Sequence, residues 1–251
     1  MKNYYSVLLC VISCAIISCD GLINSEKGSN NKKNGIVKQY RAGNILKNEI
    51  SVKDGKRHGV SKNYYKDGKS VHQLIEYKMG KKHGEAITYY ENGSIYQTTP
   101  YVEGNIHGVR KKYRQNGELL AEIPYNNGLP CKGLKEYLLD GTVKKQYPKI
   151  VFSTKDNLLK DGTFELFAQM SDKSKKVDYY VNGRLTKEGC IAKKVGSLTN
   201  YKPGIARLKY NLPPNAYMME EITIMAVVTT KLGNPYITIG KYNLAIENRG
   251  F

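Results

Sequence analysis

The chain has 251 residues, which is long for one small domain and suits two. Its 40 Lys and Arg against 22 Asp and Glu give a formal net charge of +18, and 40% of its residues are hydrophobic. This composition excludes a collagen-like chain, a fully disordered chain and a membrane protein with many spans. The 21 tyrosines, against 4 Phe and no Trp, favour β-strands, so we expect an all-β protein.

The N-terminus has the form of a secretory signal peptide. Residues 4–17 are apolar or small and carry no charge, but a segment of about 14 residues is too short to span ~30 Å of hydrocarbon as a helix. It ends in IISC and resembles a bacterial lipobox. The resemblance implies cleavage before Cys19, a diacylglyceryl thioether on its sulfur and acylation, for example with palmitate, of the new amine.

We therefore expect a lipoprotein signal peptide over residues 1–18 and a flexible polar tether over residues 19–34. Two alternatives remain open. The sequence VISC at Cys14 fits the same pattern, although cleavage there would leave a shorter apolar segment, so we prefer Cys19. The other alternative is an uncleaved signal anchor. The expected location is the bacterial cell envelope, with the protein held on the inner or outer membrane by its lipid.

The middle of the chain repeats with a period of 24 or 25 residues. Glycines recur in three parallel series, which share that period, and such periodicity indicates a repeat architecture. The series are Gly35, Gly59, Gly84, Gly108 and Gly133; Gly43, Gly68, Gly93, Gly117 and Gly141; and Gly55, Gly80, Gly104 and Gly128.

Each repeat reads as one β-hairpin. A short run ends in tyrosine, a turn dipeptide such as Asp67-Gly68 or Asn92-Gly93 follows, and a second run closes on Tyr-x-x-Gly. Because Asn-Gly and Asp-Gly provide the positive φ values of a type I′ turn, we place the I′ turns at these dipeptides. Four units and a partial fifth then form a repeat array over residues 35–147.

These motifs resemble the MORN repeat in its bacterial variant form, which includes antitoxin-like proteins. The sequence Tyr-x-x-Gly-x-x-x-Gly stands as YKMGKKHG at 77–84 and as YVEGNIHG at 101–108. The resemblance implies a meandering antiparallel sheet of stacked hairpins. It also implies a binding or scaffolding role, and the repeats of this group are not themselves enzymes.

The repeat tyrosines recur at equivalent positions, so we expect them to stack into aromatic ladders down the sheet. The rival interpretation is an aromatic platform for sugar rings or a partner. The ladder residues are Tyr64, Tyr77, Tyr89, Tyr101, Tyr113 and Tyr125.

Residues 148–251 lose the period and read as a second β domain. About seven alternating segments are separated by turn signals at 8–15-residue intervals, which favours an immunoglobulin-like β-sandwich. The segments VDYYVNGRL and ITIMAVVTTKLGN also resemble strands of bacterial Ig-like domains. The fold expected for the whole chain is thus a hairpin array followed by an Ig-like sandwich.

Of the five cysteines, only Cys131 and Cys190 lie beyond the signal peptide and the lipidation site at Cys19. An exported pair can form a disulfide, but the two lie in different predicted domains, so we favour two buried free thiols. His58, His83 and His107 share one register position. Equivalent positions lie two strands apart, about 9.6 Å, and one zinc cannot easily bridge that distance, so we expect no metal site and no cofactor.

No arrangement of residues indicates an enzyme. The sequence contains no GxSxG, no Ser-x-x-Lys and no kinase motif, and its acidic residues are scattered rather than paired. Basic residues instead recur near the repeat loops and form candidate anion-binding loops. These residues are Lys56, Arg57, Lys81, Lys82, Arg110, Lys111 and Lys112.

Three functions follow from these features. The favoured one is a non-enzymatic binding or scaffold lipoprotein whose repeat sheet holds an envelope protein. The second is docking on anionic lipid or polysaccharide through the basic loop edge. The third is the antitoxin-like role implied by the family resemblance. Export argues against a nucleic-acid partner.

Overall fold

The computed structural model describes residues 33–250 apart from 193–195 and 199. The predicted signal peptide and Cys19 lie outside these residues. Within them, no helix has the length and apolar content needed to cross a membrane. The described chain forms twenty strands and one four-residue helix, which confirms the all-β prediction.

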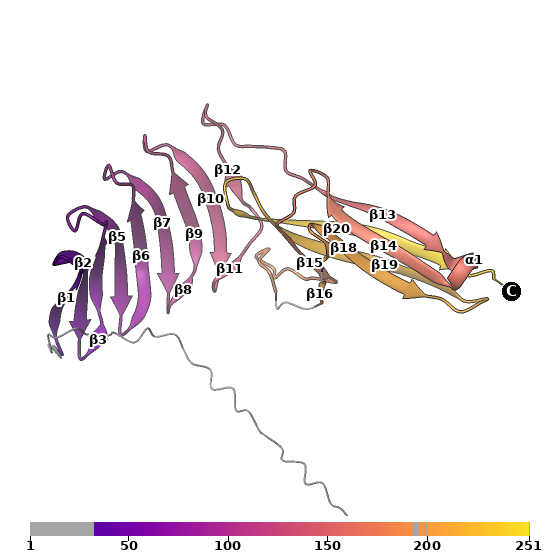
Figure 1. The fold of residues 1–251 in the computed structure, drawn as a ribbon, viewed down its shortest axis with the longest axis horizontal. Helices are drawn as coiled ribbons and strands as arrows, with labels where there is room; N and C mark the ends of the chain where they lie inside the picture. The colour runs from indigo at the N-terminus through magenta and orange to yellow at the C-terminus, as the bar shows by residue number, and fades with distance from the viewer. Residues whose placement is uncertain (1–32, 193–195, 199, 251) are drawn as a thin grey trace, which may run out of the picture. The chain divides into compact units, whose positions relative to one another are not determined.

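The repeats form one antiparallel sheet of 12 strands in which each hairpin pairs with the next (Figure 1). The main path runs β1-β2-β4-β5-β6-β7-β9-β10-β11, and the short strands β3, β8 and β12 pair with β2, β7 and β10. The strands are β1 (Gly35–Arg41), β2 (Ile45–Lys53), β3 (Lys56–Arg57), β4 (Gly59–Tyr64), β5 (Val71–Lys78), β6 (Lys81–Tyr89), β7 (Ile95–Val102), β8 (Asn105–Ile106), β9 (Gly108–Tyr113), β10 (Leu119–Asn126), β11 (Leu129–Pro130) and β12 (Lys135–Glu136).

Two kinds of turn alternate along this sheet. The sequence predicted type I′ turns at the Asn-Gly and Asp-Gly dipeptides within the hairpins, and this prediction was wrong. In the turns at Asp67-Gly68, Asn92-Gly93, Asn116-Gly117 and Asp140-Gly141 within the hairpins, only the glycine has positive φ. The Asn92 side chain accepts the Ser94 N–H instead, as in an Asx turn. The two-residue turns between hairpins have positive φ at both residues, for example 48° at Met79 and 90° at Gly80. These are the type I′ turns.

A side-chain hydrogen bond joins each hairpin to the next along the edge that carries the Asx turns. The residue after each strand-ending tyrosine donates to a main-chain carbonyl 23 or 24 positions further on. The bonds are Arg41 to Tyr65 O at 2.7 Å, Tyr65 to Tyr89 O at 2.5 Å, Tyr90 to Tyr113 O at 2.8 Å and Arg114 to Tyr137 O at 2.7 Å. Leu138 occupies the fifth equivalent position, and its side chain has no hydrogen-bond donor.

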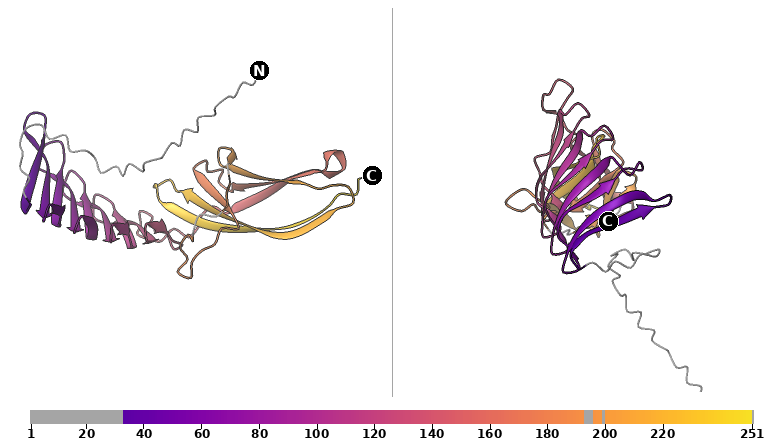
Figure 2. Two further views of the ribbon diagram at one scale, coloured as in Figure 1. Left: turned by 90° about the horizontal axis from the view of Figure 1, so that it is seen from below. Right: turned by 90° about the vertical axis from the view of Figure 1, so that its left-hand side faces the viewer.

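The C-terminal residues form a sandwich of two four-stranded sheets, seen as two layers in Figure 2. Their orders are β13-β14-β18-β17 and β16-β15-β19-β20, and the Ig-like assignment of this sandwich stays a prediction. The elements are β13 (Ile150–Asn157), α1 (Leu158–Asp161), β14 (Thr163–Met170), β15 (Val177–Val181), β16 (Ser197–Leu198), β17 (Asn200–Lys202), β18 (Ile205–Asn211), β19 (Tyr217–Thr229) and β20 (Pro235–Glu247).

Residues of both sheets fill the sandwich core. Leu166 and Met170 of β14, Tyr179 of β15 and Ile224 of β19 are all at most 1% exposed. The Tyr179 hydroxyl donates to Gly204 O at 3.0 Å, and burial raises the pKa of Tyr179 to about 12. This tyrosine supplies both apolar volume and a satisfied polar group where antibody domains use a disulfide and a tryptophan.

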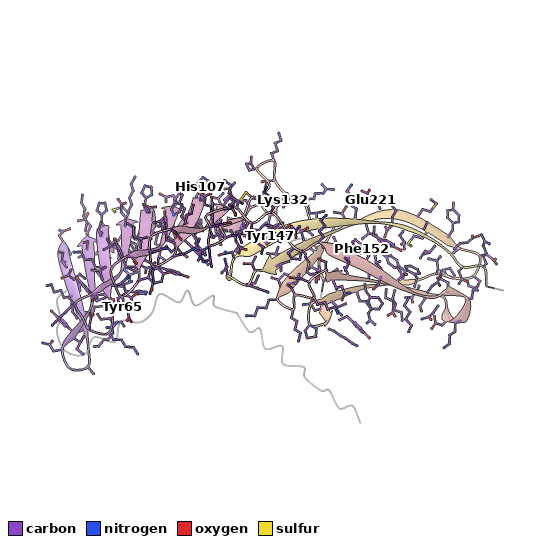
Figure 3. The ribbon with its side chains drawn as sticks, turned by 90° about the horizontal axis from the view of Figure 1, so that it is seen from above. Tyr65, His107, Lys132, Tyr147, Phe152 and Glu221 are labelled. Carbon is purple, nitrogen blue, oxygen red and sulfur yellow. A yellow bond between two sulfur atoms is a disulfide. The ribbon has the colours of Figure 1, made fainter. Side chains whose placement is uncertain are left out.

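A disulfide joins the last repeat to the sandwich, so the expectation of two free thiols was wrong. Cys131 bonds to Cys190, 59 residues away in sequence. Cys190 belongs to a small hairpin over residues 184–192, held by the Leu185–Ile191 bridge. That hairpin continues the array: the Ile191 N–H donates to Pro130 O, and Gly189 O accepts the Lys132 N–H. Lys132 is labelled beside this junction in Figure 3.

A buried carboxylate and an aromatic pair complete the junction. Glu136 of β12 is 3% exposed and accepts hydrogen bonds from Thr230 at 2.6 Å and Asn234 at 2.9 Å, both in the turn between β19 and β20. Tyr147 (Figure 3) stacks on Tyr236 of β20, with ring centroids 4.5 Å apart. The last repeat and the sandwich are therefore joined by covalent, polar and aromatic contacts.

Candidate functional site: the two faces of the repeat sheet

Successive residues of a strand point to opposite faces of the sheet, so the array offers two candidate binding surfaces. We call them the Gln73 face and the Leu74 face, after two consecutive residues of β5. The strand pairings trace one row of side chains across the whole sheet on each face, and these two rows have different chemistry.

The row on the Gln73 face is mainly amide and hydroxyl. Several members bond to one another: Asn63 donates to Gln73 at 3.3 Å, and Gln73 donates to Thr88 at 3.2 Å. The polar groups of this row thus largely satisfy each other, as buried polar groups must, which points to a structural role. The row is Gln39, Asn48, Asn63, Gln73, Thr88, Gln97, Lys112, Ala121 and Glu136.

The predicted anion-binding residues do not form a free basic edge. Arg57, Lys82 and Arg110 lie over the rings of Tyr77, Tyr101 and Tyr125, at 5.3, 4.9 and 4.7 Å from their centroids. These three cation–π contacts hold the cations against the sheet. Each of these tyrosines stands directly opposite a glycine of the neighbouring strand, at Gly59, Gly84 and Gly108.

The other basic candidates have different surroundings. Lys81 pairs with Glu103 at 3.0 Å, and Lys56 is exposed. Arg110, Lys111 and Lys112 lie within strand β9 rather than in a loop. Lys112 is 8% exposed, and its burial lowers the pKa of its ammonium group. The Lys112 ammonium donates to Leu232 O at 3.4 Å, so this lysine contacts the sandwich.

The tyrosine ladder also differs from its prediction. Tyr77, Tyr101 and Tyr125 lie on the Gln73 face, and Tyr64, Tyr89 and Tyr113 lie on the Leu74 face. Equivalent rings are two strands apart, about 9.6 Å, which exceeds stacking distance. Among the described residues, the repeat rings that do meet are Tyr90 and Tyr96, at 5.1 Å, and Tyr65 with His72, at 4.6 Å.

The row on the Leu74 face has charged ends and an apolar middle. It reads Lys-Glu-Lys, Leu-Ile-Thr, Lys-Glu-Lys from strand to strand. The members are Lys38, Glu49, Lys62, Leu74, Ile87, Thr98, Lys111, Glu122 and Lys135. Each charged triplet has two lysines for one glutamate and therefore a net charge of +1.

The two glutamates are held in the same way. Glu49 accepts a hydrogen bond from the Tyr64 hydroxyl and Glu122 accepts one from the Tyr137 hydroxyl, both at 2.8 Å. These bonds are the largest cause of the lowered pKa of each carboxyl group, and the outer lysines add to it. Both carboxylates therefore stay ionised well below neutral pH.

An open cavity of about 470 Å³ lies beside the apolar middle of the row. Lys62, Val71, Leu74 and Tyr89 line it, together with the Asx turn at 90–93. Val71 and Tyr89 belong to the Leu74 face, since they pair with Tyr64 and Ile95. We define the apolar centre of the Leu74 face as Val71, Leu74, Ile87, Tyr89, Ile95 and Thr98.

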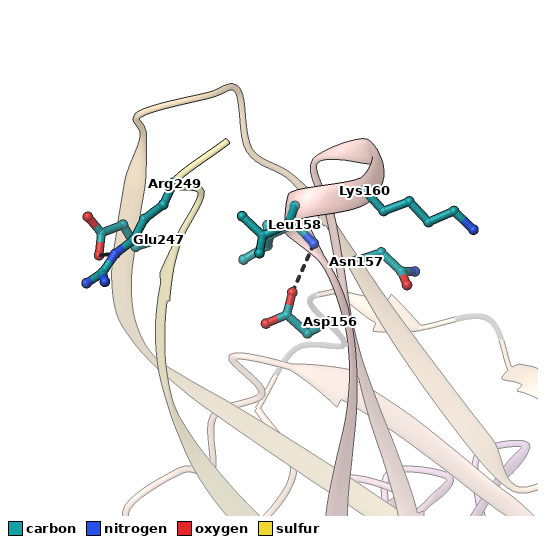
Figure 4. Close-up of a pocket in the computed structure, with 7 residues that line it drawn as sticks. Asp156, Asn157, Leu158, Lys160, Glu247 and Arg249 are labelled. Atoms are coloured by element: carbon teal, nitrogen blue, oxygen red, sulfur yellow. Dashed lines mark hydrogen bonds and ion pairs between the residues drawn. The ribbon is translucent and has the colours of Figure 1, made fainter. Parts of the chain in front are cut away.

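A second cavity, of about 380 Å³, lies at one end of the sandwich (Figure 4). Three of its charged side chains already have partners: Asp156 accepts the Leu158 N–H at 2.9 Å, and Glu247 pairs with Arg249 at 2.8 Å. The side chains of Asn157 and Lys160 also line this cavity.

Two of the three repeat histidines have a buried ring nitrogen. His58 Nδ1 and His83 Nδ1 are buried without a hydrogen-bond partner. Within the described ranges, no group of three or more His, Cys, Asp and Glu side chains is placed to hold a metal ion.

Sequence reasoning missed the side chains that join the repeats and those that form the apolar centre. Arg41, Tyr65, Tyr90 and Arg114 stand directly after the strand-ending tyrosine, and the recurrence of a long donor there was the available signal. Leu74 and Ile87 occur in strands without regular alternation, so only the strand register places them in one row.

Comparison with known families supports the repeat assignment. The family described as the MORN repeat variant matches residues 57–79, 82–103 and 106–127. These segments correspond to the hairpins β4–β5, β6–β7 and β9–β10, so the chain carries at least three repeats of this kind. No curated protein matches the chain.

Proposed function

We propose that this protein is a non-enzymatic binding module whose Leu74 face holds a protein partner. The observation that carries the proposal is the apolar centre on a sheet face of MORN repeats. Leu74 and Ile87 are partly exposed, Ile95 is 38% exposed and an open cavity adjoins them. Apolar side chains gathered beside a depression are typical of a protein interaction site.

We further propose that the protein is lipid-anchored on Cys19 in the bacterial envelope. The IISC motif after an apolar segment supports this location. The Cys131–Cys190 bridge also supports it, because structural disulfides persist in oxidising compartments and are rare in the cytosol. Radiolabelled palmitate should enter the wild-type protein and the Cys14→Ala variant and fail to enter the Cys19→Ala variant.

The binding proposal is tested by capture from envelope extract on the mature, unlipidated chain, followed by elution in salt steps. The Debye length falls from ~8 Å at 0.15 M to ~3 Å at 1 M salt, which weakens exposed charge contacts but not apolar ones. A protein that stays bound at 1 M salt, and is lost from a Leu74→Thr/Ile87→Thr variant, is the expected result. The control is Leu159→Thr, an exposed leucine of the sandwich.

Other outcomes decide between the remaining functions. Recovery of only lipid or polysaccharide, released at low salt, would favour docking through the basic residues. The tyrosine and carboxylate contacts of Arg57, Lys82, Arg110 and Lys81 weigh against that alternative. An envelope toxin as the captured protein would favour the antitoxin-like role. Turnover of an envelope substrate by the purified chain would contradict all three.

A further inference from the structure

The charges within the row on the Leu74 face are arranged symmetrically about its apolar middle. In each triplet the glutamate carboxylate already bonds to the outer lysine and to a tyrosine hydroxyl. Lys38 bonds to Glu49 at 3.1 Å, and Lys135 bonds to Glu122 at 3.4 Å. The inner lysines, Lys62 and Lys111, make no ion pair within the described part of the chain. Both therefore have ammonium groups available to another molecule.

The two inner lysines are separated by four strand-to-strand steps, through Leu74, Ile87 and Thr98. At about 4.8 Å a step, their backbones lie roughly 19 Å apart. An α-helix covers that distance in about 13 or 14 residues, and of these two spacings only 14, about 21 Å, also places both positions on one face at 3.6 residues per turn. A helix lying across the strands would thus place its apolar side chains over Leu74 and Ile87 and one carboxylate near each lysine.

The cavity fits the same arrangement. It lies next to Lys62 and is walled by Val71, Leu74 and Tyr89. A single apolar side chain of the helix would enter it, as anchor residues do when amphipathic helices bind in grooves. On the opposite margin of the row, Glu76 and Glu85 are exposed, so that margin favours a neutral or basic flank on the partner.

We propose that the partner of this module presents an acidic amphipathic helix, with an apolar stripe between two carboxylates about 14 residues apart, which docks across strands β4–β9. This inference rests on the proposed binding function and specifies the chemistry of its partner. Complementary charge sets the register of the helix and speeds its association, while the apolar stripe supplies most of the affinity. The chain's net charge of +18 favours an acidic partner in the same sense.

Two designed helical peptides test the proposal. Each has about 18 residues and the same Leu-rich stripe. One carries Glu at both flanking positions, about 14 residues apart on the same face of the helix, and the other carries Lys there. Binding of each to the full unlipidated chain is measured by fluorescence anisotropy at low salt. We expect the Glu peptide to bind at least about tenfold more tightly than the Lys peptide.

A charge-reversal variant, Lys62→Glu/Lys111→Glu, should abolish or invert this preference. The control variant Lys160→Glu/Lys175→Glu has the same net charge and alters two exposed lysines of the sandwich, and it should keep the preference. Circular dichroism verifies that both variants remain folded.

Equal binding of the two peptides, binding of neither, or a preference that survives Lys62→Glu/Lys111→Glu would each overturn the proposal. Such a result is distinguishable from failure of the proposed function. A chain that still captures a salt-resistant protein through Leu74 and Ile87, yet shows no preference between the peptides, retains its binding function and has a partner of different chemistry.

Discussion

The hydroxyl of Tyr90 links its hairpin to the next one, and the adjacent Tyr89 provides a matched comparison. Tyr90 donates to Tyr113 O of the next hairpin, whereas no hydrogen bond from the Tyr89 hydroxyl is present in the described structure. Tyr90→Phe should therefore lower the free energy of unfolding by about 1 kcal/mol. Tyr89→Phe is the matched control and should change it by much less. Urea unfolding of the two variants measures the difference, and equal effects would contradict the inter-repeat bond.

Alkaline pH should weaken the sandwich through Tyr179. Its folded-state pKa is raised to about 12 by burial, above the unfolded value of about 10. The folded state therefore holds this proton more tightly, and the stability it contributes is fully present below pH 10. Between about pH 10 and pH 12 it is lost at up to about 1.4 kcal/mol per pH unit.

Tyr179→Phe tests this titration. The variant loses the bond to Gly204 O, so it should be less stable at pH 7, by about 1 kcal/mol. Its stability should then fall less steeply than that of the wild type between pH 10 and pH 12. Denaturant unfolding at several pH values gives both slopes, and parallel slopes would show that Tyr179 titrates equally in the two states.

At the scale of the hairpin, a reciprocal exchange distinguishes the two kinds of turn. Met79 has a φ of 48° in a type I′ turn. A positive φ is costly for a long apolar residue such as methionine, whereas asparagine tolerates it. Met79→Asn should stabilise the protein by about 0.5–1 kcal/mol. Asn92→Met should destabilise it by about 1 kcal/mol, because Asn92 holds the backbone of Ser94. If Met79→Asn destabilised the protein and Asn92→Met stabilised it, the type I′ turns would lie within the hairpins, as the sequence predicted.

Gly93 offers a simpler test of the same element. It has a φ of 84°, although the space around a new Cβ is empty. Gly93→Val should therefore destabilise the protein through its backbone rather than through a clash, since β-branched residues tolerate positive φ poorly. An unchanged melting temperature would show that the turn adapts without strain.

The hairpins could be predicted from the sequence because their glycines and tyrosines recur with one period. The turn type could not, since the dipeptide Asn92-Gly93 suits both an I′ turn and an Asx turn followed by a left-handed glycine. The choice depends on the register of the flanking strands. The same limit applies to the Leu74 face: Lys62, Leu74 and Ile87 are ordinary residues until the strand pairing places them side by side.

At the scale of the molecule, alignment of the repeats contained a signal for the disulfide between Cys131 and Cys190. Cys131 occupies the position of His58, His83 and His107, as the shared backbone bonds of His58, His107 and Cys131 indicate. Replacement of the repeat histidine at the end of the array was therefore a visible signal. The partner hairpin at 184–192 was not predictable, because its role depends on how the sandwich meets the last repeat.

Removing the bridge should loosen this junction. A closed loop of 59 residues corresponds to about 4 kcal/mol of unfolded-state entropy in the chain-entropy account. Cys131→Ala/Cys190→Ala should lower the melting temperature under oxidising conditions, and reduction of the wild type should have a similar effect. The variant itself should not respond to reductant. A variant as stable as the oxidised wild type would show that Glu136 and Tyr147 hold the junction without the bridge.

We propose that the partner lies on the Leu74 face of the repeat sheet. Oxidative footprinting of side chains, with and without the captured partner, tests it most directly. The sandwich provides internal references, because Tyr217 and Met219 are 77% and 75% exposed. We expect the partner to protect Leu74, Ile87 and Tyr89 and to leave Tyr217 and Met219 reactive. Protection confined to the sandwich, with the apolar centre unchanged, would contradict it.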